Sequence, residues 1–435
     1  MNLVTSFAFL LQEFSVVMNA KTLANLTTLT AGWIFAHRHT VTGMVVAAGM
    51  AGVKHHSIFH HIFAAARWSL DDAGLAVFRL LERFLDEEMV LLGIDDTLAR
   101  KRGLKIFGVG MHHDPLLSSR GHKVTNWGLN WVVLGVIVRF PLWPDRPFCL
   151  PILFRLYLNG KAAAKWRRKQ RTRPELAVEM LRVLCHHRQN LRFHAVVDSS
   201  YGGHSVLAHL PNNCDLTSRL RLDARLYDAP TTRTGQRGRP RVRGLQLPTP
   251  EQMLQQRVRR QTLSIYGRDQ KMRICDAEAR VFKVPDRPLR VVAVEALTGG
   301  RGREAFYSTC HTAVAIDVLT WYSWRWSIEQ AFHDSKQYLG FEEPQGWSRR
   351  AVQRTAPMAM LLYSLIVVWF VEYGHADYRP VKRPWYLTKE HESFADMLVT
   401  LRRVSVREDI SNLGLSGPGS RKITQIVEHL AQLAV

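Results

Sequence analysis

Four residues in the C-terminal half of the chain have side chains suited to binding phosphate or metal: Tyr322, Arg325, Glu329 and Lys336. An α-helix turns by ~100° per residue, so their spacing predicts a single stripe about 60° wide on one helix face. Tryptophan and phenylalanine residues crowd the same segment, which indicates partial burial. Two interpretations stay open: an Arg–Glu i,i+4 pair on a solvated face, or a buried charged site whose charges are paired or functional.

Further carboxylates stand at the ends of two apolar segments. Asp95 and Asp96 end MVLLGIDDT (89–97), and Asp198 follows the apolar residues of FHAVVDSSYGG (193–203). Both segments are typical of buried strands with acids at their C-terminal ends. Carboxylates are the ligands that Mg²⁺ and Mn²⁺ prefer, and two such ions can activate water and stabilise a phosphodiester during cleavage. These acids could do such chemistry only if the fold brings them together with Glu329.

The elements that must position these acids predict a mixed α/β fold. A helical N-terminal block, 1–85, contains Ser69 as a predicted helix N-cap, and we expect it to be a DNA-binding domain. Further strands are expected at 124–140 and 148–158, and a helix at 174–191. We expect the catalytic domain in two parts, 86–214 and 301–375, separated by a β-rich insertion at 215–300 and followed by a helical region at 376–435.

Composition points to a polyanionic partner. The 435 residues include 59 Lys+Arg against 37 Asp+Glu, a net charge of +22, which favours nucleic acid. The five cysteines are scattered, which indicates neither a disulfide framework nor a zinc ribbon and is compatible with a reducing cytoplasm. The apolar run 357–371 is shorter than the ~20 residues that span a bilayer, so a buried core helix and no membrane association are expected. The N-terminal residues do not have the pattern of a signal peptide.

Two basic segments are candidate phosphate contacts. Residues 161–173 hold seven Lys/Arg and no acid, and residues 233–243 hold five arginines. Such runs are either solvated loops or phosphate-binding loops, and the net charge favours the second interpretation. Arg237, Arg239 and Arg241 are the candidates in the second segment. Arg237 to Pro240 also resembles an AT-hook core, which inserts arginines into a narrow minor groove.

Together, the aspartates of GIDDT and VVDSSYGG and the Tyr-x2-Arg-x3-Glu-x6-Lys spacing resemble bacterial insertion-sequence transposases of the DDE superfamily. The resemblance covers about residues 89–372 and implies an RNase H-like mixed sheet flanked by helices, with an inserted β-rich subdomain. It implies that Asp95, Asp198 and Glu329 are the catalytic, metal-binding acids. It also implies that Tyr322, Arg325 and Lys336 hold DNA phosphates.

The resemblance implies metal-dependent DNA cleavage at transposon ends, followed by transfer of the freed 3′-OH into target DNA. Mg²⁺, with Mn²⁺ able to substitute, is the expected cofactor, as two ions. The expected partner is double-stranded DNA, both terminal repeats and target, bound by a homodimer in a bacterial cytoplasm. The alternatives are a stand-alone RNase H-like nuclease and a non-catalytic DNA-binding protein derived from a transposase.

Some assignments stay open at this point. The family pattern of Asp, any residue, then Ser or Thr selects Asp95 with Thr97, whereas another register selects Asp96. Trp324 and Trp326 are either core residues or stacking surfaces for an unpaired base. The histidine-containing segments 54–61 and 111–114 have no closed zinc pattern, and we interpret them as loop or DNA-facing histidines.

Overall fold

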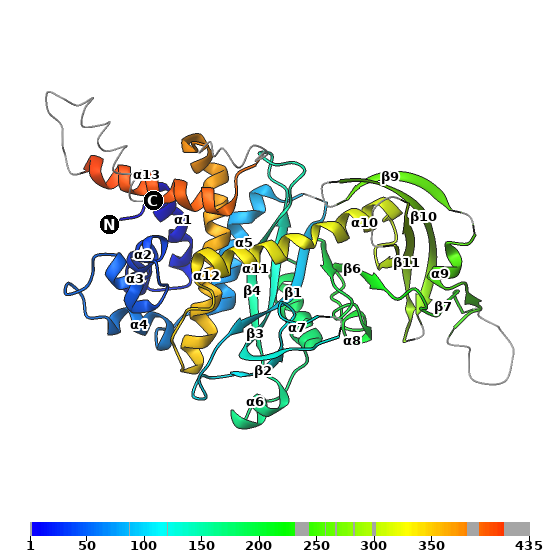
Figure 1. The fold of residues 1–435 in the computed structure, drawn as a ribbon, viewed down its shortest axis with the longest axis horizontal. Helices are drawn as coiled ribbons and strands as arrows, with labels where there is room; N and C mark the ends of the chain where they lie inside the picture. Colours follow the sequence, from blue (N-terminus) through cyan, green and yellow to red (C-terminus); the bar gives the residue numbers. More distant parts are fainter. Residues whose placement is uncertain are drawn as a thin grey trace.

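The computed structural model describes residues 2–86, 88–119, 121–230, 243–256, 258–265, 268–281, 283–297, 302–380 and 391–412 (Figure 1). Its N-terminal block is helical, with short 3₁₀ helices η1 and η2 at Gln12–Val16 and Glu82–Phe84. The α-helices are α1 (Thr5–Leu11), α2 (Ala20–Phe35), α3 (Val41–Ala47), α4 (Ser57–Ala64) and α5 (Leu70–Leu81). Ser69 caps α5 as predicted, because its hydroxyl accepts the Asp72 N–H at 3.2 Å.

One mixed sheet runs through the middle of the molecule. Its strands are β1 (Val90–Arg100), β2 (Gly110–His113), β3 (Thr125–Val138), β4 (Phe148–Tyr157), β5 (Phe193–Val197), β6 (Cys214–Leu220), β7 (Leu226–Tyr227), β8 (Gln246–Leu247), β9 (Arg259–Ile265), β10 (Arg268–Val281), β11 (Val284–Ala296) and β12 (Arg303–Ser308). The order is β2-β3-β1-β5-β6-β12-β11-β10-β7-β8, with β4 paired to β3 and β9 paired to β10.

The part of the sheet made by β4, β3, β1, β5 and β6 has the predicted RNase H-like arrangement. β4, β3 and β1 pair antiparallel, and β5 and β6 then add parallel to β1. Parallel neighbours need a covered crossover, which α7 (Arg173–His187) supplies between β4 and β5. Thr172 and Glu175 form a capping box at the start of α7, which fixes where this helix begins. The predicted fold class is confirmed.

Two local predictions were wrong. β1 does not end at the aspartates but continues to Arg100, because it stays paired with β3 up to Gly128 after its parallel partner β5 has stopped. The loop interpretation of segment 111–114 is also wrong for residues 111–113, where β2 pairs with β3; His112 is buried, and His113 is exposed. His112 therefore packs inside the protein, and of these two histidines only His113 is accessible to a partner.

Residues between β6 and β12 extend the same sheet. β12 pairs with β6, and β11, β10, β9, β7 and β8 follow, with the short helix α9 (Pro250–Met253) packed beside them. Figure 1 shows these strands as a lobe at the end of the molecule far from α1 to α4. Arg237, Arg239 and Arg241 lie outside the described residues.

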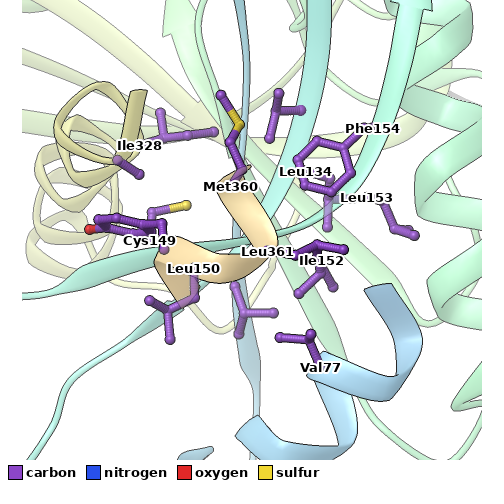
Figure 2. Close-up of a cluster of buried hydrophobic side chains, with 14 of the residues drawn as sticks. Val77, Leu134, Cys149, Leu150, Ile152, Leu153, Phe154, Ile328, Met360 and Leu361 are labelled. Atoms are coloured by element: carbon purple, nitrogen blue, oxygen red, sulfur yellow. The ribbon is translucent and has the colours of Figure 1, made fainter. Parts of the chain in front are cut away.

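The remaining helices cover the sheet. They are α6 (Gly160–Lys165), α8 (His204–Leu207), α10 (Ala315–Trp324), α11 (Trp326–Leu339), α12 (Arg349–Glu372), η3 (Gly374–Asp377) and α13 (Phe394–Asn412). Figure 2 shows side chains of α5 (Val77), α11 (Ile328) and α12 (Met360, Leu361) gathered against those of β3 and β4. Of the helices described, α12 alone is long and apolar enough to cross a membrane, and 89% of its apolar window is buried inside the protein. The prediction of a core helix over 357–371 is confirmed.

Close packing of α5 on β4 leads to a stability prediction. A Cβ on Gly74 would lie 1.8 Å from the Ile152 carbonyl oxygen, so Gly74→Ala forces α5 away from the strand. We expect a loss of about 1–3 kcal/mol in the free energy of unfolding, measured by denaturant titration. Gly121→Ala is the control, because no atom lies within 4 Å of that Cβ. Equal stability of the two variants would contradict this packing.

Candidate active site

The two neighbouring aspartates of β1 have different surroundings. Successive side chains of a strand point to opposite faces of the sheet, so Asp95 and Asp96 cannot share a site. Asp96 accepts hydrogen bonds from Arg173 Nη1 (2.9 Å), Asn130 Nδ2 (2.9 Å) and the Tyr201 hydroxyl (2.8 Å). Asp95 faces the junction of α10 and α11. The structure thus gives Asp96 a full set of partners on the α7 side and leaves Asp95 on the side of Glu329.

Asp198 comes next to Asp95 because of the strand register. β1 and β5 are parallel and end their pairing at Ile94 opposite Val197, so the next residue of each strand is an aspartate. Neighbouring strands lie about 4.8 Å apart. The Asp198 carboxylate accepts hydrogen bonds from the N–H (2.8 Å) and hydroxyl (2.7 Å) of Ser200. These bonds hold the side chain at the point where β5 leaves the sheet.

The turn after Asp198 is anchored to the neighbouring strands. The Ser218 hydroxyl on β6 donates to the Asp198 carbonyl oxygen at 2.9 Å, and the Tyr307 hydroxyl on β12 donates to the Gly202 carbonyl oxygen at 2.5 Å. A Cβ on Gly202 would lie 2.3 Å from Ser218 Oγ, so the close approach needs glycine. Strands that are distant in sequence therefore set the position of Asp198.

The segment 322–336 is not one regular helix as its spacing predicted. α10 ends at Trp324 and α11 begins at Trp326, and Figure 1 shows the two helices running end to end. At the junction, the Arg325 N–H bonds to the Tyr322 carbonyl (3.3 Å) and the Ile328 N–H bonds to the Arg325 carbonyl (3.1 Å). Both hydrogen bonds join residues three positions apart, as in a 3₁₀ helix, and so tighten the turn. Arg325 thus sits at a break in the helix directly over β1.

Arg325 joins two of the three predicted acids. Its Nη1 lies 2.6 Å from Asp95 Oδ2 and its Nη2 lies 3.1 Å from Glu329 Oε1. The Arg325 side chain is only 12% exposed. Its Nε–H is buried and has no acceptor within the described part of the chain, so the guanidinium retains one unused donor. A buried donor of this kind is costly unless a ligand supplies an acceptor.

Burial dominates the electrostatics of Asp95. Desolvation raises the pKa of Asp95 to about 7, the Arg325 guanidinium opposes this shift, and the nearby carboxylates of Asp198 and Asp96 raise it further. Like charges close together disfavour ionisation, whereas a cation placed among them favours it. The site is therefore short of positive charge, with one arginine set against several acids.

Tyr322 and Lys336, which the resemblance assigns to DNA phosphates, both contact other parts of the protein. Tyr322 is 6% exposed, packs on Phe306 at 4.7 Å between ring centroids, and lies under the Arg325 guanidinium at 5.6 Å. Lys336 donates to the Leu98 carbonyl oxygen at 2.9 Å and lies 3.6 Å from Glu342. Burial lowers the pKa of Lys336. Both side chains support the junction and β1 from within the protein. Trp324 is partly buried under Arg139, whereas Trp326 is half exposed.

The residue types in this site fit a divalent metal. No three His, Cys, Asp or Glu side chains within the described ranges are grouped closely enough to hold an ion as they stand, since Arg325 lies between Asp95 and Glu329. Oxygen donors and an excess of negative charge are nevertheless what Mg²⁺ and Mn²⁺ require. The raised pKa of Asp95 indicates that its ionised form lacks sufficient compensation here, which a cation would supply.

Sequence reasoning missed the partners of Asp96. Arg173 and Tyr201 lie 77 and 105 residues from it along the chain, and only the folded sheet and the start of α7 bring them together. The capping box at Thr172 was the available signal, because it places Arg173 at the first position of α7.

The two aspartates predict stability losses of different size. Asp96→Ala leaves Arg173 and the Tyr201 hydroxyl without their acceptor, and we expect a loss of about 1–3 kcal/mol in the free energy of unfolding. Asp95→Ala removes a carboxylate whose ionised form burial disfavours and leaves Arg325 paired with Glu329, so the loss should be smaller. Chemical denaturation of both variants near neutral pH measures the difference. A larger loss for Asp95→Ala would mean that Asp95, not Asp96, is the main structural partner.

Comparison with known proteins adds a family assignment to this geometry. The family model described as "DDE superfamily endonuclease" matches residues 10–274. The match takes in Asp95 and Asp198 and ends before Glu329, which the fold brings to the same place. None of the curated proteins compared with the chain matches it. Since the matched region is more than half of the 435 residues, the chain belongs to the DDE superfamily endonuclease family.

Proposed function

We propose that the protein is a DNA transposase, which cuts at the ends of a mobile element and joins the freed 3′-OH to target DNA. The observation that carries the proposal is the meeting of Asp95, Asp198 and the Arg325–Glu329 junction on one face of an RNase H-like sheet. Membership of an endonuclease family and a net charge of +22 both support DNA as the substrate.

Asp95, Asp198 and Glu329 are the proposed ligands of two Mg²⁺ ions, which Mn²⁺ could replace. Such ions, when bound, supply Lewis acidity and lower the pKa of bound water. The chain's own contribution is to fix the acids. The β1–β5 register holds the two aspartates side by side, and Arg325 links Glu329 to Asp95. Ser200 orients the Asp198 carboxylate through two hydrogen bonds.

Arg325 is the proposed contact to DNA phosphate at this site. Its planar fork matches a phosphate as well as it matches a carboxylate, and its unused Nε–H is a further donor. Tyr322 would act by positioning Arg325, because its ring lies under the guanidinium. Lys336 would place a second cation near the strand that carries Asp95. Arg237, Arg239 and Arg241 are proposed to contact DNA phosphates from the lobe.

The proposed partners are the terminal repeats of the element and its target, both as double-stranded DNA. A homodimer that pairs two ends is the proposed working form, acting at the nucleoid in a bacterial cytoplasm. The N-terminal helical block, α1 to α5, is the proposed DNA-end recognition part.

Cleavage by a Glu329→Gln variant tests the function. The change preserves shape but removes the charge of one proposed metal ligand, so we expect cleavage to fall by about 10³-fold or more. DNA binding should stay largely intact. The assay follows a labelled duplex carrying the repeat that flanks the coding region, with Mg²⁺, Mn²⁺ or EDTA.

Glu278→Gln serves as the matched control, since that glutamate is 58% exposed and lies on β10, in the lobe and not at the candidate active site. Metal-dependent nicking at the repeat boundary by the wild type and by this control, but not by Glu329→Gln, supports the transposase. Cutting without regard to the repeat supports a general nuclease instead. Specific binding with no cutting in any metal supports a non-catalytic DNA-binding protein.

The pKa of Asp95 predicts how metal binding depends on pH. A proton occupies this carboxyl below about pH 7 in the folded protein, whereas the unfolded value is about 3.8. A metal must displace that proton, so its affinity rises with pH through this range. We expect Mg²⁺ to raise the melting temperature more at about pH 8 than at about pH 6.

Asp95→Asn is the control for this experiment, because an amide does not titrate here. The variant should lose most of the pH dependence between these two values. A wild-type Mg²⁺ response that stays constant with pH would exclude Asp95 as the titrating ligand.

A further inference from the structure

A basic cleft of about 490 Å³ opens at the edge strand β4, away from the acids. Residues from α5, β3, β4, α7 and the start of α12 line it. Its lining includes five arginines, namely Arg155, Arg171, Arg349, Arg350 and Arg354. Only two carboxylates, Asp71 and Glu179, line it with them. Asp95, Asp198 and Glu329 are not among the lining residues, so the cleft is separate from the candidate active site.

The two carboxylates are already used by two of the arginines. Arg155 binds both oxygens of Asp71, at 2.6 and 2.8 Å, and donates its Nε–H to Glu179 at 2.8 Å. Arg171 also pairs with Glu179. These contacts balance the charges of Arg155 and Arg171 within the cleft wall.

The other three arginines have no such compensation. Arg354 donates to the carbonyl oxygens of Ala66 (2.8 Å) and Trp68, and Arg350 donates to that of Ala65 (3.3 Å). Carbonyl oxygens satisfy hydrogen bonds but do not neutralise charge. Across the described segments, no Asp or Glu pairs with Arg349, Arg350 or Arg354. The cleft therefore holds a local excess of positive charge.

Their place in α12 makes this excess more unfavourable. Arg349 and Arg350 are the first two residues of a 24-residue helix, where the helix dipole already carries positive charge. The N-cap residue Ser348 makes no side-chain hydrogen bond to the first turn. Burial lowers the pKa of Arg349, and the charges of Arg168 and Arg350 add to that effect. A bound anion would relieve all three effects at once.

A buried donor in the same cleft also lacks an acceptor. Trp131 lines the cleft, is only 1% exposed, and its indole N–H has no partner in the described part of the structure. Buried indole N–H groups usually find a hydrogen bond. This observation is independent of the arginines and indicates a missing acceptor.

The cleft continues into a second one along α7. That second cleft, of about 980 Å³, shares Arg171 and Glu179 with the first and adds Lys169, Arg182 and His186, together with one further acid, Glu175. Arg168 lies close enough to Arg349 to lower its pKa. The basic segment 161–173 and the start of α12 thus form one strip, although Arg173 and Arg349 are 176 positions apart in the sequence.

We propose that this strip, the two clefts joined at Arg171, binds the sugar–phosphate backbone of duplex DNA outside the acid site. Duplex DNA is chosen because the strip is long, basic and open, and because the proposed function, on which this inference rests, makes DNA the partner. Arginines without carboxylate partners bind phosphate by counterion release, without regard to base sequence. The strip would hold a stretch of duplex that is not itself being cut.

The test measures how salt affects binding of a duplex that lacks the terminal repeat, by fluorescence anisotropy in EDTA. R349Q/R350Q should lower affinity and reduce the log–log salt slope by roughly 1.8, about 0.9 for each lost phosphate contact. R349K/R350K keeps the charges and should retain most of the slope. K123Q/R225Q removes two exposed cations that line neither cleft and lie outside the N-terminal helical block, so it should leave the slope near wild type.

Gln353→Glu is a second variant that removes no existing arginine contact but adds a negative charge to the cleft lining. It should weaken binding in the same assay if R349Q/R350Q fails to fold. An unchanged affinity in Gln353→Glu, or an unchanged slope in a folded R349Q/R350Q, would overturn the proposal.

The two proposals can fail separately. Binding in EDTA does not depend on cleavage, so a protein that never cuts but loses slope in R349Q/R350Q would overturn the transposase and keep the strip. A protein that cuts at its repeat but shows the wild-type slope in R349Q/R350Q would overturn the strip alone.

Discussion

The ion pair between Arg325 and Asp95 is the contact around which the candidate site is arranged. Asp95 lies on a strand covered on both faces, where an isolated carboxylate would be strongly disfavoured. Arg325 lies at the break between α10 and α11, and its guanidinium contacts both Asp95 and Glu329. β1, β5 and the α10–α11 junction thus converge on one buried cation. Removing Arg325 would leave the Asp95 carboxylate buried without a cation, whereas removing Asp95 leaves Arg325 paired with Glu329.

The neighbouring aspartates of β1 lie on opposite faces of the sheet and have different partners. On one face, Asp96 ties the sheet to α7 through Arg173 and Tyr201. On the other, Asp95 has Arg325 as its ionic partner and Asp198 beside it. A shift of one residue in the register would exchange these roles. The long pairing of β1 with β3, from Leu92 to Arg100, holds that register.

Much of the fold could be predicted from local patterns. The apolar runs of β1, β3, β4 and β5 and the cap at Ser69 are local signals, and the structure agrees with them. Periodicity could not decide between Asp95 and Asp96, because strands buried on both faces show no alternation, and only the family resemblance favoured Asp95. The break at Arg325 was not visible either, since the residues around it are compatible with a continuous helix. The buried position of Tyr322 and the half-buried position of Lys336 depend on β12 and β1, which lie elsewhere in the sequence.

The pairing of β6 with β12 has a mechanical consequence. The lobe is joined to the rest of the sheet by a ladder of backbone hydrogen bonds between β6 and β12, and not by a linker alone. Ser218 and Tyr307, which face each other in that ladder, are the residues that hold the turn after Asp198. A force applied to β10 and β11 is therefore transmitted through stiff strands to one of the three acids. Movement of the lobe and the position of the turn after Asp198 are therefore mechanically coupled.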